Sequence, residues 1–157
     1  MTSQHTEADQ LLARLESGHG DRAAVFAELA DKLAAHCEIE ERIFYPAAMK
    51  RATADQLHEA VEEHLSVKRL LADMLALDVH ADKDSFDAKL SVLKEQLSHH
   101  AHEEEEQTLF LELRRSMSAD ERAGLGNECL VMFETLMTSS PRRQIPNETA
   151  AAAKLPA

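Results

Sequence analysis

The sequence predicts an all-α protein: an antiparallel up-down four-helix bundle with an additional short C-terminal helix and a tail. Three observations lead to this prediction. Apolar residues recur every three or four positions in four long segments, which is the spacing of one face of a helix. The connections between these segments are short, as between neighbouring antiparallel helices. The 157 residues include only four Gly and four Pro, and no stretch has the alternating pattern of a strand.

Start and stop signals separate the long segments. We expect helices over roughly 3–17, 21–48, 53–78 and 84–117. Gly18-His19-Gly20 breaks the chain between the first two, and Asp21 suits the N-cap of the second. Thr53-Ala54-Asp55-Gln56 has the form of a capping box at the start of the third helix.

A fifth, shorter helix is expected from a second capping box, Ser118-Ala119-Asp120-Glu121, to about Thr138. From Ser139 the composition changes, and little apolar surface remains to be buried. We expect this last stretch to be extended or flexible, or pinned to the surface. The sequence therefore predicts one bundle domain over 1–138 and a C-terminal tail over 139–157.

Composition and charge exclude several classes of partner. The formal net charge is −12, from 29 Asp and Glu against 17 Lys and Arg, which disfavours binding to nucleic acid or to an anionic membrane. No apolar run is long enough to span a bilayer, and no signal peptide is visible. Two Cys without paired spacing indicate a reduced compartment, so we expect a cytoplasmic protein. We also expect a monomer.

Each long helix carries a histidine inside its own apolar stripe. Six polar groups lie in these stripes: His5, His36, Glu40, His64, His100 and Glu104. A single core His is more often an ordinary hydrogen-bonded residue, and a single His-x3-Glu pair more often lies on a surface. Burying all six groups at matched depth without a cation would cost too much free energy. The pattern therefore predicts a metal site inside the bundle.

The types of side chain restrict the metal. Imidazole and carboxylate ligands without thiolate suit iron, manganese or zinc better than copper(I) or an iron–sulfur cluster. Six side chains are too many for one tetrahedral zinc ion. Two carboxylates that can bridge indicate two metal ions close together, as in the di-iron carboxylate bundles.

The register of the fourth helix is open between two alternatives. Counted from the leucines that precede it, the inward pair is His100 and Glu104. Counted back from the apolar residues 109–111, the pair is His102 and Glu106. The longer upstream run favours the first alternative, and a one-residue π-bulge would reconcile the two.

Five stretches of the chain form a recognisable set: Gln4-His5-Thr6-Glu7, AHCEIEERIFYPA (35–47), EEHLSVKRLL (62–71), HHAHEEEEQTLFLEL (99–113) and SADERAGLG (118–126). Together they resemble the hemerythrin-like, HHE cation-binding domain family over roughly residues 3–125. The resemblance implies two iron ions joined by an oxo or hydroxo bridge. It implies as their ligands His5, His64, His36, Glu40, His100 and Glu104, with the two glutamates bridging.

One departure from the family concerns the third helix. Oxygen-carrying hemerythrins have a second His one turn after the ligand on this helix, where this chain has Lys68. One iron should therefore keep a more open position. Lys68 either hydrogen-bonds a bound oxygen species or reaches past the site to solvent, and we favour the second. Tyr45 is expected to pack near the bundle end, with a supporting role beside the irons as the alternative, and Glu103 and Glu105 on a solvated face.

The resemblance implies a non-heme di-iron protein that binds or reacts with a small oxidant: peroxide, nitric oxide or dioxygen. The open position favours peroxide chemistry of the catalase type, or nitric oxide chemistry, over reversible oxygen carriage. A small diatomic or peroxide ligand is therefore the expected partner. The alternative is an iron- or oxygen-responsive sensor without turnover, in which metal loading orders the bundle and a partner detects that order.

Overall fold

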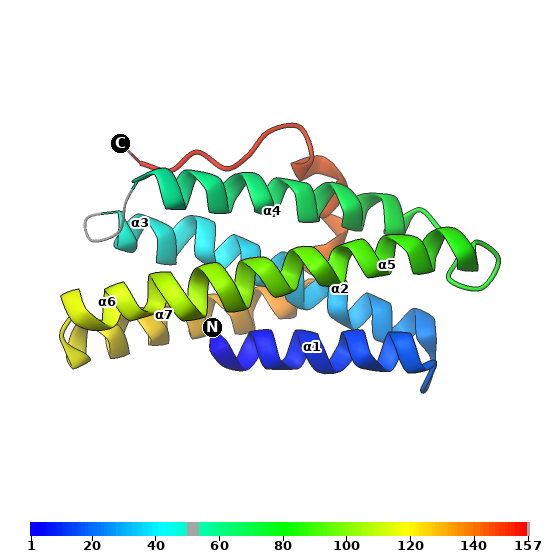
Figure 1. Cartoon of the computed structure of the whole chain (residues 1–157), viewed down its shortest axis with the longest axis horizontal. Coiled ribbons are helices and arrows are strands. Elements are labelled where there is room, and N and C mark those ends of the chain that lie inside the picture. The colour runs from blue at the N-terminus through cyan, green and yellow to red at the C-terminus, as the bar shows by residue number, and fades with distance from the viewer. Residues whose placement is uncertain (50–53, 157) are drawn as a thin grey trace.

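Four antiparallel helical rods form the bundle in the computed structural model, which describes residues 1–49 and 54–156 (Figure 1). The first rod is α1 (Thr2–Ser17) and the third is α4 (Ala54–Leu75). The second rod joins α2 (Arg22–Ile39), the π-helical turn η1 (Glu40–Phe44) and α3 (Tyr45–Ala48). The fourth joins α5 (Lys83–Ser98), the π-helix η2 (His99–Leu109) and α6 (Phe110–Ser116). The predicted fold class is confirmed, and the described residues contain no strand.

The fifth helix, α7 (Ala119–Met137), packs against α2 and η1. Its capping box is present, because Ser118 Oγ accepts from the Glu121 N–H and the Glu121 carboxylate accepts from the Ser118 N–H. The predicted N-cap of the second rod is also present, since the Asp21 carboxylate accepts from the first free N–H groups of α2. The capping box predicted at Thr53 begins outside the described residues.

Two apolar clusters fill the two ends of the bundle. The first includes Leu29 and Leu33 of α2, and the second includes Tyr45 of α3. His36 and Glu40 lie between them along the same rod, so a polar layer separates the two clusters. None of the described helices combines the length and the apolar character that crossing a bilayer needs.

The C-terminal segment 139–157, expected to be extended or flexible, or pinned to the surface, packs on the bundle and is not extended over its whole length. It forms two 3-10 turns, η3 (Pro141–Arg143) and η4 (Ile145–Glu148), which pack against α2 and α4. Ile145 is only 1% exposed and belongs to the first apolar cluster. Arg142 pairs with Asp31 of α2. The segment then follows α4 to the C-terminus (Figure 1). A boundary between domain and tail at residue 138 stays a prediction.

Candidate metal centre

Buried imidazole and carboxylate groups from all four rods meet in the polar layer. Six of them, which we call the inner site, are His5, His36, Glu40, His64, His100 and Glu105. Their exposed fractions range from 0 to 8%. Their ligand atoms form two groups, and within each group all atoms lie within 4.8 Å of one another. The first group is His5, His36, Glu40 and Glu105, and the second is Glu40, His64 and His100.

Both carboxylates of the inner site face both groups. Glu40 Oε1 lies 3.2 Å from His36 Nε2, and Glu40 Oε2 lies 3.2 Å from His64 Nε2. Glu105 Oε2 lies 3.2 Å from His5 Nε2, while its Oε1 lies 4.0 Å from an imidazole Nε2 of the second group. Each carboxylate therefore presents one oxygen to either side, which is the arrangement of a bridging ligand.

Each of the four imidazoles is held from outside at its Nδ1 atom. The acceptors are Glu106 for His5 (2.7 Å), Gln4 for His36 (2.9 Å), Glu41 for His64 (3.0 Å) and Glu63 for His100 (2.7 Å). Because carboxylate and amide oxygens only accept, each Nδ1 carries a proton. Nε2 of such a ring is free to bind a metal once any second proton has left it, and all four Nε2 atoms point inward. Imidazole binds metals in this tautomer, oriented by such an outer partner.

The inward atoms of the inner site fit metal ions. The Nε2 atoms of the two imidazoles are 3.2 Å apart in the first group and 3.1 Å apart in the second. Two bare lone pairs at this distance repel each other, so each pair of rings shares either a proton or a metal cation. Glu40 Oε1 and Glu105 Oε2 are buried without a hydrogen-bond donor. Such acceptors are costly to bury, and a cation in the first group would pair both of them.

The pKa shifts show how strongly these groups interact. Burial raises the pKa of Glu105, and the like charge of Glu40 raises it further. Burial lowers the pKa of His36 to about 3, against the attraction of Glu40. Burial also opposes protonation of His100, but Glu40 and Glu63 outweigh it and raise the pKa to about 10. Divergent pKa shifts among adjacent groups are typical of functional sites.

The hydroxyl of Tyr45 lies at the centre of the inner site. It donates to Glu105 Oε1 at 3.0 Å and lies 3.4 Å from Glu40 Oε2. It is also 3.3 Å from the Nε2 atoms of His64 and His100. Burial and the two carboxylates raise the pKa of Tyr45, so the phenol keeps its proton. Its ring packs in the second apolar cluster, and its hydroxyl lies beside the inner ligands, which was the alternative expectation for Tyr45.

The sequence favoured a Lys68 side chain that reaches past the site to solvent. In the structure this side chain is buried. Lys68 is 6% exposed, and its Nζ donates to both Glu41 oxygens, at 3.0 and 2.8 Å. Glu148 of η4 lies 3.0 Å from the same Nζ atom. Since Glu41 also accepts from His64 Nδ1, Lys68 stabilises the carboxylate that orients His64.

The fourth rod places its inward pair in neither predicted register. His100 lies in the inner site, but the carboxylate that joins it is Glu105, five residues later. Glu104 lies outside, with its Oε1 atom 3.1 Å from His99 Nε2. The physical reason is the π-helical backbone of η2, which accommodates more residues per turn than an α-helix and so rotates the next residue inward.

The alternative pair also lies outside the inner site. His102 contacts Asp9 of α1 at 3.0 Å, and its side chain is 35% exposed. Glu106 accepts from His5 Nδ1, so it orients an imidazole from outside and does not face the centre. The structure thus brings together five of the six predicted residues, and Glu105 stands where Glu104 was expected.

Glu105 was the residue that sequence reasoning missed, because it was assigned to a solvated face. Residues 103–106 are four consecutive glutamates, so their type does not distinguish one register from the next. The available signal was the disagreement between the upstream and downstream registers, which indicates an inserted residue.

Comparison with known proteins agrees with this geometry. The family model of the hemerythrin HHE cation-binding domain matches residues 1–122. This range includes all four rods, and therefore every residue of the inner site. Neither the curated proteins nor the solved structures include a match. The chain belongs to the hemerythrin family of HHE cation-binding domains.

Proposed function

We propose that this protein is a non-heme di-iron protein that binds or reacts with peroxide, nitric oxide or dioxygen at the inner site. One observation carries the proposal: two groups of inward ligand atoms share Glu40, and the buried oxygens Glu40 Oε1 and Glu105 Oε2 lack a hydrogen-bond donor. Such a pair of groups suits two metal ions joined by carboxylate. Imidazole and carboxylate ligands together suit iron.

The protein's own residues support chemistry with a small oxidant. Bound iron supplies the electrons and the Lewis acidity that activate such a ligand. The two apolar clusters close the polar layer at both ends of the bundle, so bulk water does not enter along the bundle axis. The Tyr45 hydroxyl oxygen lies 3.0 Å from Glu105 Oε1, at the centre of the site, where its proton would face a bound ligand.

The second ligand group is the proposed position for the exogenous ligand. It contains three His and Glu side chains, whereas the first group contains four. Lys68, at the position where oxygen carriers have a further His, is held by Glu41 and Glu148 and supplies no ligand to this group. This supports reaction with peroxide or nitric oxide over reversible oxygen carriage.

A sensor without turnover is the second candidate, and the C-terminal segment favours it. Glu148 of η4 contacts Lys68, which in turn holds the carboxylate that orients His64. A change at the inner site therefore has a path of direct contacts to an exposed part of the molecule. A partner that binds this segment would detect metal loading.

Metal content and absorption spectra test both candidates. We expect about two irons per chain after loading, and charge-transfer absorption that changes with peroxide or nitric oxide. Steady peroxide turnover would support an enzyme. A spectral change with a large gain in thermal stability, but without turnover, would support a sensor. Iron-loaded protein whose spectrum responds to none of the three oxidants would contradict the proposal.

A further inference from the structure

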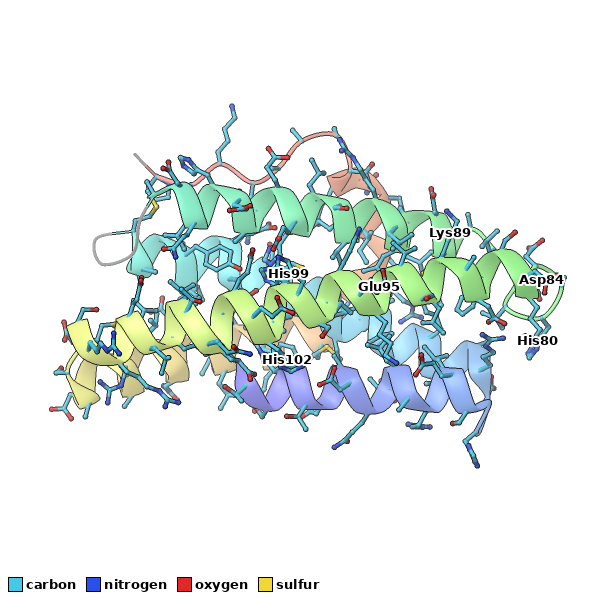
Figure 2. All side chains as sticks on the ribbon, in the orientation of Figure 1. His80, Asp84, Lys89, Glu95, His99 and His102 are labelled. Carbon is cyan, nitrogen blue, oxygen red and sulfur yellow. The ribbon has the colours of Figure 1, made fainter. Side chains whose placement is uncertain are left out.

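A second group of potential metal ligands lies outside the inner site. It consists of Glu63 of α4 and of His99 and Glu104 of η2, whose ligand atoms lie within 4.8 Å of one another. His99 Nε2 is 3.1 Å from Glu104 Oε1 and 3.9 Å from Glu63 Oε1. Figure 2 shows His99 on the side of the rod that faces α4, while His102 lies on the side that faces α1. The His99 side chain is 54% exposed, so solvent reaches this group directly.

Glu63 connects this outer group to the inner site. Its Oε2 atom accepts from His100 Nδ1 at 2.7 Å, and its Oε1 atom faces His99. One carboxylate therefore contacts an inner ligand on one side and the outer group on the other.

A cavity of about 340 Å³ is lined by residues of both the outer group and the inner site. His99 and Glu104 line it on the outside, and His100 and Glu105 of the inner site also line it. Glu105 is only 1% exposed, so the cavity meets the inner site at a buried residue. The space is sufficient for several water molecules, each of which takes about 30 Å³, and therefore for an ion with part of its hydration shell.

The charges around this cavity favour a cation. Its described lining includes four glutamates, namely Glu59, Glu103, Glu104 and Glu105, and neither Lys nor Arg. A cleft lined by charge of one sign raises the local concentration of counter-ions and increases their rate of arrival.

We propose that Glu63, His99 and Glu104 form an outer site that captures a divalent cation from solvent and passes it through this cavity to the inner site. The inference rests on the proposed metal occupancy of the inner site, because a site buried to this degree needs a path by which metal ions arrive. No covalent or redox step is involved, since the ion only exchanges water and side-chain ligands.

Uptake of Co²⁺ by metal-free protein tests this outer site. The visible absorption of Co²⁺ changes when it leaves water for imidazole and carboxylate ligands, so both the rate of uptake and the final number of ions are measurable. The test variant is H99A/E104Q. The matched control is H80A/E134Q, which removes the same two groups from exposed positions away from the cavity.

We expect H99A/E104Q to take up Co²⁺ roughly tenfold more slowly than wild type, at low ionic strength, and to reach the same final number of ions. The single variant E104Q should show part of the slowing. Because it is the milder change, it keeps the test valid if the double variant misfolds locally. Equal uptake rates for wild type and H99A/E104Q, with the inner site filled in both, would overturn the outer site alone. Failure of wild type to bind any ion would overturn the proposed function and this inference together.

Discussion

The second and fourth rods contribute the same pair of groups to the inner site, but they space it differently. In the second rod, His36 and Glu40 lie four residues apart, and the π turn η1 begins only at Glu40. In the fourth rod, His100 and Glu105 lie five residues apart inside η2. The fourth rod therefore has one additional residue between its imidazole and its carboxylate.

Beyond the carboxylates the two rods match again. The Tyr45 N–H donates to the Glu40 carbonyl, and the Phe110 N–H donates to the Glu105 carbonyl, so each pair spans one π turn. The additional residue of the fourth rod is compensated by its longer π-helix, and Glu104 is displaced to the outer site. A π turn can thus direct two adjacent glutamates toward two different sites.

The largest expected effect tests whether the two carboxylates are equivalent. Glu40 belongs to both ligand groups, whereas Glu105 belongs to the first alone. We expect Glu40→Gln to weaken metal binding by more than roughly a hundredfold. This loss is larger than the loss that follows from removing a residue that only orients a ligand. Equilibrium titration with Fe²⁺ or Co²⁺ measures this change. Glu28→Gln, at an exposed position of α2, is the control. Retention of both ions by Glu40→Gln would show that the two groups do not share this residue.

The register of the fourth rod is tested by two adjacent substitutions. Glu105→Gln should weaken binding at the first group by roughly a hundredfold, because it removes a ligand charge from a buried position. Glu104→Gln should leave the number of ions at the inner site unchanged, since Glu104 faces His99. Metal analysis after dialysis separates the two results. The opposite order of effects would restore the α-helical register that the upstream leucines predicted.

The sequence was sufficient for the rods and for most of the inner site. Helical periodicity located His36, His64 and His100, because an imidazole inside an apolar stripe must face the core. It did not locate the carboxylate of the fourth rod, since periodicity assumes a constant number of residues per turn and η2 departs from it. Periodicity could not decide between the two expectations for Tyr45 for the same reason, because η1 rotates it toward Glu40.

The C-terminal segment was not predictable for a different physical reason. Ile145 is buried in the first apolar cluster, and Ala152, Ala153 and Leu155 pack against the second. The segment's polar contacts include pairs with partners far away in the chain, such as Arg142 with Asp31 and Glu148 with Lys68. Local patterns carry no information on such long-range pairs.

The two rods also differ in the partner that orients each imidazole. His36 donates to the neutral amide of Gln4, whereas His100 donates to the carboxylate of Glu63. Hydrogen bonds to charged acceptors are roughly twice as strong as neutral ones. We expect Glu63→Gln to weaken equilibrium metal affinity by about tenfold and Gln4→Ala by less. Titration of both variants with Co²⁺ makes the comparison, and equal losses would mean that the charge of the orienting group is unimportant.

The smallest effect is expected from Tyr45→Phe. This substitution makes the two rods alike, because the fourth rod has Phe110 at the matching position. The variant keeps the ring in the second apolar cluster but removes the donor to Glu105. Glu105 would keep its buried acceptor unpaired, so we expect a loss of about 1 kcal/mol in the unfolding free energy of the metal-free protein. Denaturant unfolding measures it, and the iron content should stay that of wild type. A variant that is as stable as wild type would mean that the phenol proton does not stabilise the carboxylates. The role of Tyr45 would then be restricted to proton donation when an oxidant is present.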